Sequence, residues 1–221
     1  MSDEQIIKLI EEEFRIQSLG VTQQYLEIHH PVYVNHQLSI TRIDREASDG
    51  VIIAYLPVQG ADFYFAVYIS AMANEITGIG TEAQHRVYFH ASSESLSDYD
   101  LCSMCSLIPT ESHNKGALIK NGRAKRAYSS LSYLPNPEPD EFEDKLRKLL
   151  DFLEQDEIGI KRLVNEAAGY IQVATVMHNG NGMLLGPTID KSSIQRMAGL
   201  GLEINFDLYV SGNQFLEERS G

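Results

Sequence analysis

The sequence predicts an α+β protein, in which an N-terminal helix and an antiparallel β-meander precede an α/β sandwich of ferredoxin-like or similar type. Between residues 32 and 91, short β-branched and aromatic stretches are separated by turn clusters, as in antiparallel strands. After residue 139, amphipathic helical stretches alternate with short strands. We therefore divide the chain into a helix and meander at 1–84, an α+β domain at 85–211 and a polar tail at 212–221. The two sheets are either separate or one continuous sheet.

The N-terminal part begins with a helix. Ser2 and Gln5 form a capping-box pattern, and apolar residues follow at helical spacing until Gly20. A second short helix is predicted over 22–28. A meander of four or five strands follows, with strands predicted at 38–43, 51–55, 63–69 and 86–90.

The C-terminal part mixes helices and strands. A capped short helix is predicted from Ser95 or Ser97 to Met104, and the least regular stretch, 108–139, holds one predicted strand at 127–133. Further helices are predicted at 139–153, 160–169 and 190–198, with strands at 170–177, 183–185 and 202–210 and a hairpin turn at 178–182. The apolar stripe of the helix at 139–153 and one face of the strand at 202–210 should bury each other. The expected core is therefore Phe142, Leu146, Leu150, Ile204, Phe206 and Leu208, with Tyr209 on the opposite face of the strand.

Composition excludes several classes of protein. The 221 residues carry 31 acids against 18 Lys and Arg, a net charge of -13, which repels nucleic acid and anionic membrane as a whole. No apolar run approaches the ~18 to 20 residues of a membrane span, and the start has no signal-peptide pattern. Two cysteines three positions apart form no disulfide framework, so we expect a cytoplasmic protein.

The second half resembles a known family. Leu107-Ile-Pro-Thr, a Lys115-Gly116 pair and the ending Leu200-Gly-Leu-Glu-Ile-Asn-Phe-Asp-Leu-Tyr209 are similar to the family catalogued as domain of unknown function 4279. The resemblance covers about residues 85–211. Members commonly carry a tryptophan after Lys-Gly, where this chain offers Tyr128 or Tyr133. The resemblance implies an α+β domain and assigns no activity and no catalytic residue.

No motif completes a catalytic, cofactor or metal site. Cys102 and Cys105 lack a second ligand pair for zinc and a cationic neighbour for redox work, so we expect small buried residues. The seven histidines have no metal spacing and are expected at the surface or at strand ends. Ser92-Ser93 and Gly78-Ile-Gly80 complete neither a nucleophile elbow nor a phosphate loop and are expected in turns. The sequence leaves enzymatic activity open and favours none.

A basic segment interrupts the acidic chain. Between Ser112 and Pro137 there is no acid. The five bases of this segment are Lys115, Lys120, Arg123, Lys125 and Arg126. They are candidates for contacts to an anionic ligand or to nucleic acid, with Tyr128 and Tyr133 available for stacking. The alternative is a solvated loop that pairs with the acidic body of the same protein.

The acidic charge of the chain outside the basic segment predicts a basic protein partner. Residues 1–100 hold 15 acids and 5 bases, and such a field steers a cationic protein toward the surface. Bacterial immunity proteins that neutralise cationic toxins share these traits. The leading expectation is therefore a non-enzymatic protein-binding module of this kind. A ligand-binding or regulatory module that uses residues 112–137 is the alternative.

Overall fold

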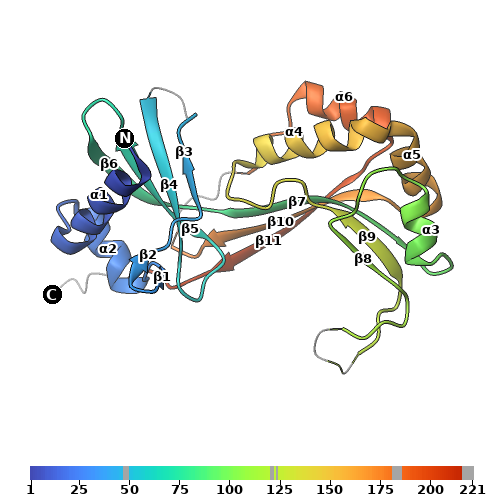
Figure 1. The fold of residues 1–221 in the computed structure, drawn as a ribbon, viewed down its shortest axis with the longest axis horizontal. Helices are drawn as coiled ribbons and strands as arrows, with labels where there is room; N and C mark the ends of the chain where they lie inside the picture. Colours follow the sequence, from blue (N-terminus) through green and yellow to red (C-terminus); the bar gives the residue numbers. More distant parts are fainter. Residues whose placement is uncertain (47–49, 120–121, 123, 181–185, 216–221) are drawn as a thin grey trace. The chain divides into compact units, whose positions relative to one another are not determined.

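The computed structural model describes residues 1–46, 50–119, 122, 124–180 and 186–215 (Figure 1). The fold is α+β, as predicted, and the described residues form three β-sheets. The chain forms two compact units, and each is described by itself. Unit 1 holds residues 1–84, 176–185 and 208–221, and unit 2 holds residues 85–175 and 186–207.

Unit 1 begins with two helices, followed by a β-hairpin and a four-stranded antiparallel meander of order β3-β4-β5-β6. Its elements are α1 (Asp3–Ile16), α2 (Gly20–Ile28), β1 (Tyr33–Val34), β2 (Gln37–Leu38), β3 (Arg42–Asp44), β4 (Val51–Pro57), β5 (Tyr64–Ser70) and β6 (Glu75–Glu82). The predicted capping box of Ser2 and Gln5 is present. Ile6 and Ile10 are fully buried in a core with Phe65, so the apolar stripe of α1 holds the helix on the meander.

Two segments that the sequence predicts to be turns lie in strands. Gly78 and Gly80 lie in β6, where they pair with Tyr68 and Ala66 of β5. The Tyr68 ring lies beside both glycines, so cross-strand packing outweighs the turn preference of glycine there. Ser92 and Ser93 likewise lie inside a strand of unit 2, where they pair with Ser130 and Ser129. Both turn predictions were therefore wrong.

Unit 2 is a five-stranded sheet of order β11-β10-β7-β9-β8. Its sheet and helices are β7 (Gln84–Ser93), α3 (Asp98–Ser103), β8 (Glu111–His113), β9 (Ser129–Tyr133), α4 (Phe142–Leu153), the 3-10 turn η2 (Glu154–Asp156), α5 (Glu157–Glu166), β10 (Tyr170–His178), α6 (Lys191–Leu200) and β11 (Ile204–Ser211). The last residues of β10 and β11, from 176 and 208 onward, belong to unit 1. β9 pairs antiparallel with both β7 and β8. The order β10-β7-β9-β8, with a helix after β7 and helices after β9, is the ferredoxin-like arrangement that the sequence predicted.

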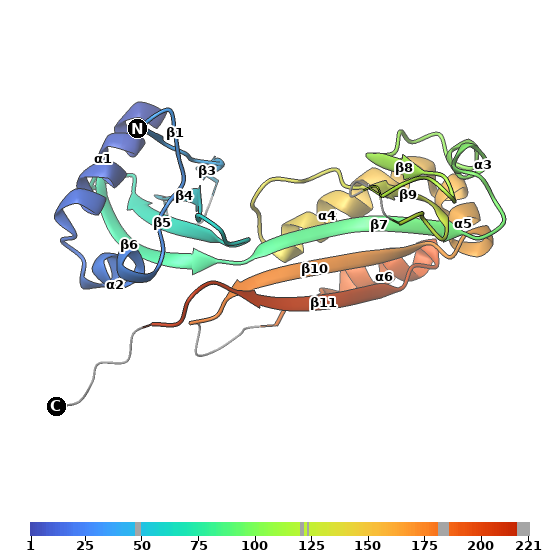
Figure 2. The same ribbon diagram turned by 90° about the horizontal axis from the view of Figure 1, so that it is seen from below.

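β11 extends this sheet through a parallel crossover. The amide of Ile171 donates to the Glu203 carbonyl (2.8 Å), and that of Asn179 donates to the Ser211 carbonyl (2.9 Å). The equal offset of the two bonds means that β10 and β11 run in the same direction, as their arrows do in Figure 2. α6 is the helical connection that such a parallel pair requires. The predicted strand at 183–185 lies outside the described residues.

Helices α4, α5 and α6 lie on one face of the unit 2 sheet (Figure 1). Of the residues expected in the core, Phe142, Leu146 and Leu150 are buried, and Ile204 packs partly buried against the same cluster. Phe206 is 37% exposed, but its ring packs on that of Phe142 at 5.7 Å between centroids. Leu208 is 58% exposed, so the prediction that it belongs to the core was wrong. The reason is that β11 is an edge strand, where few neighbours cover a side chain. Tyr209 is exposed, as expected.

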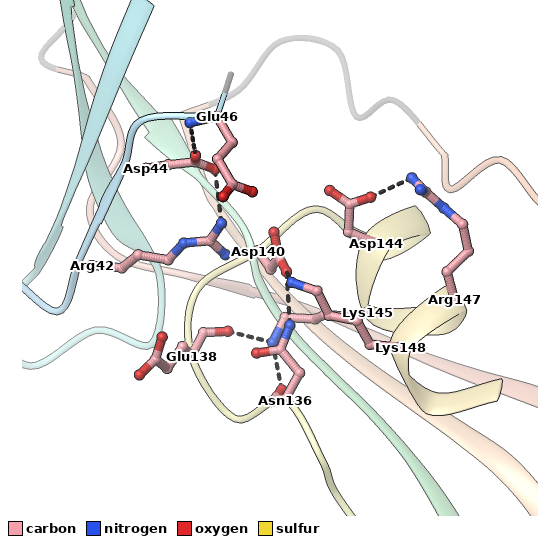
Figure 3. A network of polar contacts seen from close by, with 10 residues as sticks. All are labelled: Arg42, Asp44, Glu46, Asn136, Glu138, Asp140, Asp144, Lys145, Arg147 and Lys148. Atoms are coloured by element: carbon pink, nitrogen blue, oxygen red, sulfur yellow. Dashed lines mark hydrogen bonds and ion pairs between the residues drawn. The ribbon is translucent and has the colours of Figure 1, made fainter. Parts of the chain in front are cut away.

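A polar network fixes the loop that precedes α4 (Figure 3). Lys145 is 2% exposed, and its ammonium donates to the carbonyls of Asn136 (3.0 Å) and Glu138 (2.5 Å). The Asn136 amide donates to Asp140 Oδ2 (2.7 Å), which also pairs with Lys148 (2.5 Å). A buried ammonium is costly unless it is hydrogen-bonded, so these carbonyls hold the loop against the first turn of α4.

Candidate functional site

The basic segment is a β-hairpin rather than a loop. Beyond β8 and β9 the chain continues as two paired arms: the amide of Gly116 donates to the Arg126 carbonyl, and the amide of Arg126 donates to the Ala117 carbonyl (2.9 and 2.8 Å). An isolated bridge joins Leu118 to Lys125 farther out. The prediction of a strand at 127–133 is confirmed by β9, whereas β8 was missed because it has only three residues.

The structure separates the five predicted cations. Lys120 and Arg123 lie outside the described residues. Lys115 is exposed, and its ammonium donates to the Glu94 carbonyl (2.9 Å). Lys125 is exposed on the hairpin, and Arg126, which is half-buried, lines a hollow.

One of the two tyrosines proposed for stacking is not available. Tyr133 is fully buried, stacks on Phe89 at 5.7 Å between ring centroids, and donates its hydroxyl to the Leu107 carbonyl (3.3 Å). It faces the core because β9 alternates, with Ser129, Leu131 and Tyr133 inward. The prediction that Tyr133 can stack on a ligand was therefore wrong. Tyr128 is 49% exposed.

The hollow that Arg126 lines, here called the sheet-face pocket, lies on the face of the sheet opposite the core of unit 2. β7 alternates, with Val87, Phe89 and Ala91 in the core and Arg86, Tyr88 and His90 on the other face. The pocket has a volume of about 180 Å³. Its lining consists of Arg86, Tyr88, His90, Thr110, Glu111, His113, Arg126, Ser130, Ser132 and Leu134.

Hydrogen-bond donors and rings surround the pocket. The Arg86 guanidinium lies over the Tyr88 ring, 5.6 Å from its centroid. His90 Nδ1 and Ser132 Oγ share a hydrogen bond of 3.1 Å across the β7–β9 pair. Burial lowers the pKa of His90, so this imidazole is neutral at pH 7. His113 Nε2 lies 3.6 Å from a Glu111 carboxylate oxygen.

Charge makes this pocket unusual in an acidic chain. Within the described parts of the chain, no carboxylate pairs with Arg86 or Arg126. Glu111 is the one acid in the lining, and it is exposed and lies beside His113. Two unpaired guanidiniums beside serine hydroxyls can receive a carboxylate or phosphate oxygen with charge-assisted hydrogen bonds. The arrangement is therefore suited to an anionic group.

Sequence reasoning found Arg126 but missed Arg86, His90 and His113. The alternation over 86–90 was visible, and it places Arg86 and His90 on one strand face. The missing information was the pairing of β7 with β9, which joins residues about forty positions apart in the chain. Nothing in a single sequence indicates that pairing.

A second cluster of ionisable groups is buried in unit 1. His29 and His178 are 4% and 1% exposed, and their Nε2 atoms are 2.9 Å apart. Phe63 and Phe215 contact the His178 ring at 5.0 and 5.5 Å between centroids. His178 is the last residue of β10, at a strand end as expected, whereas the expectation of a surface or strand-end position was wrong for His29, which follows α2 and is buried because aromatic side chains cover its ring.

The acidic residues of unit 1 outnumber its bases. Residues 1–84 hold twelve acids and four Lys or Arg. Three of those four bases already pair with acids of the same unit, in the pairs Arg15–Glu12 (2.5 Å), Arg42–Asp44 (2.8 Å) and Arg45–Asp3 (2.5 Å). The remaining acids give unit 1 a negative field.

The two cysteines belong to the core of unit 2. Cys105 is buried, Cys102 is half-buried, and both are free thiols that pack with the apolar cluster. Burial raises the pKa of the Cys105 thiol, which disfavours the reactive thiolate. Among the residues that the structure describes, no three His, Cys, Asp or Glu side chains come together as a metal site. In the same residues no helix is long and apolar enough to cross a membrane.

Comparison with known proteins identifies a family. No curated protein and no solved structure matches the chain. A family model described as domain of unknown function (DUF4279) matches residues 83–211, which is more than half of the chain. The matched residues include β7 to β11 and every residue that lines the sheet-face pocket. The chain therefore belongs to the family of domain of unknown function DUF4279.

Proposed function

We propose that this chain is a non-enzymatic binding module that holds an anionic group of its ligand in the sheet-face pocket. The observation that carries the proposal is that two arginines line the same hollow. Arg86 comes from β7 and Arg126 from the hairpin beyond β9, and neither pairs with a carboxylate of the described residues.

The size of the pocket supports a head group rather than a whole ligand. At about 180 Å³ it is smaller than the roughly 300 to 1,000 Å³ of pockets that enclose a drug-sized molecule. Ser130 and Ser132 add hydroxyl donors beside the guanidiniums. The pocket therefore suits one phosphate or carboxylate, with the rest of the ligand outside it.

Inorganic phosphate is the simplest probe of this pocket. We expect Arg126→Gln to weaken phosphate binding by about tenfold or more, because one charge-assisted hydrogen bond contributes roughly 1.5 to 3 kcal/mol. Lys125→Gln is the matched control, since it removes a charge from the same hairpin without touching the pocket. Isothermal titration calorimetry at constant ionic strength measures both. Equal losses in the two variants would mean that phosphate responds to the general field and not to the pocket.

A second candidate is the neutralisation of a cationic protein, as bacterial immunity proteins do. The twelve acids against four bases in residues 1–84 favour it. Electrostatic attraction would act mainly on the rate of association, which salt then lowers.

The test uses the protein encoded by the gene immediately upstream. Replacing Glu4, Glu11 and Glu27 of unit 1 by Gln is expected to slow association about three- to tenfold at low salt. Replacing three exposed acids of unit 2 (Glu157, Glu166 and Glu203) is the matched control. An association rate that does not change with salt or with the unit 1 substitutions excludes this candidate.

A further inference from the structure

A row of aromatic rings leads away from the sheet-face pocket. The rings of Tyr88 and His90 on β7 are 6.5 Å apart, and those of His90 and Tyr170 on β10 are 5.6 Å apart. All three face away from the core, because their chain neighbours Phe89 and Ile171 are fully buried. The row therefore crosses two neighbouring strands on the same face as the two guanidiniums.

The rings are not stacked on one another. Tyr88 and His90 are inclined by 86°, and His90 and Tyr170 by 67°. In such edge-to-face pairs at least one ring keeps its faces away from its neighbour. All three side chains are partly exposed. One planar group cannot lie flat on all three rings at these inclinations, and the Arg86 guanidinium already lies over Tyr88. Tyr170, at the end of the row, is therefore the ring that can receive a planar group.

We infer that the ligand of the sheet-face pocket is a nucleotide, with its phosphate at the guanidiniums that line the pocket and its base on the ring of Tyr170. The inference rests on the proposed function, since it needs the anionic group to bind in the pocket. Strand geometry supports it: His90, whose ring adjoins Tyr170, follows Arg86 by four residues, about 13 Å along β7, on the same face. Phosphate contacts by arginine and base stacking on aromatic rings are the two contacts that proteins use most for unpaired nucleotides.

Two sources can supply this chemistry, a free mononucleotide and a single-stranded nucleic acid. Lys115 and Lys125 on the hairpin would meet further phosphates of a strand. The net charge of -13 opposes a long polyanion. Binding of adenosine monophosphate and of a single-stranded RNA of about ten nucleotides separates the two sources. If the RNA binds more tightly than adenosine monophosphate, per binding site, the ligand is a single-stranded nucleic acid. If the two bind equally, the ligand is the free nucleotide.

The decisive comparison is adenosine monophosphate against ribose 5-phosphate, which lacks only the base. We expect the base to tighten binding about tenfold, within the range of one stacked base. Tyr170→Leu should remove this advantage and leave the affinity for ribose 5-phosphate and inorganic phosphate unchanged. Tyr99→Leu is the matched control, because Tyr99 is 79% exposed in α3 and lies outside the ring row.

The outcomes distinguish this inference from the proposed function. If ribose 5-phosphate binds as tightly as adenosine monophosphate, or if Tyr170→Leu weakens both equally, the nucleotide assignment is overturned while the anion pocket stands. If inorganic phosphate, ribose 5-phosphate and adenosine monophosphate all fail to bind, both proposals are overturned.

Discussion

Hydrogen bonds determine the protonation of the buried His29–His178 pair. His178 Nε2 lies 2.9 Å from the Asn213 carbonyl oxygen, so it donates, and its Nδ1 accepts from the Gly180 amide (3.3 Å). His29 Nε2 accepts from the Asn213 amide (3.3 Å). Both imidazoles are therefore neutral in the folded protein, and burial, followed by the nearby His178, lowers the pKa of His29.

Acid should therefore destabilise the protein through its buried histidines. Burial lowers the pKa of His85 to about 4, with Lys145 contributing and Glu143 opposing. Because the unfolded histidine titrates near 6.5, the stability that His85 contributes is complete above that pH and is lost as pH falls from about 6.5 toward 4. We expect the free energy of unfolding to fall as the pH is lowered from about 6.5 toward 4, and to fall less in His85→Gln. Urea titrations measure it, and an unchanged pH dependence in the variant contradicts the assignment.

At the scale of elements, replacement by alanine at two helical glycines should change the stability of the protein in opposite directions. A Cβ on Gly159 of α5 would lie 2.7 Å from the Cys105 backbone, whereas one on Gly199 of α6 would meet no atom within 4 Å. We expect Gly159→Ala to destabilise the protein by about 2 kcal/mol or more, because the backbone must move. Gly199→Ala should stabilise it by roughly 0.5 to 1 kcal/mol through helix propensity. Thermal unfolding of the two variants compares them, and equal effects would mean that α5 does not pack closely on the segment after α3.

The packing of α4 gives a further test. Leu146 is 1% exposed in the core of unit 2, so Leu146→Ala should cost about 2 to 5 kcal/mol. Ile158→Ala is the control, since Ile158 is 78% exposed, and it should cost less than about 0.5 kcal/mol. A loss below that value for Leu146→Ala would contradict the docking of α4 on the sheet.

The elements that local pattern determines were predicted, and those that depend on distant partners were not. The capping box of α1 and the apolar stripe of α4 are local, and both are present. β6 and β8 were missed because pairing, and not composition, makes them strands. The site follows the same rule: Arg126 was found from charge, but Arg86 joins it only through the β7–β9 pair.

At the scale of the whole molecule, charge is unevenly distributed. A chain with a net charge of -13 places two guanidiniums around one pocket of unit 2 and leaves its N-terminal 84 residues strongly acidic. A local basic pocket in an acidic protein favours a small anion over a large one, because the long-range field repels the polyanion while the short-range hydrogen bonds remain.

The central claim is that an anion binds in the sheet-face pocket, which Arg86 and Arg126 line, and the signals of arginine side chains in nuclear magnetic resonance test it most directly. During a titration with inorganic phosphate, we predict shifts of the Nε–Hε signals of Arg86 and Arg126 and of the His90 ring. The signal of Arg162, which is on α5 and outside the pocket, should stay in place. Shifts that are absent from Arg86 and Arg126, or that appear equally at Arg162, would contradict the account.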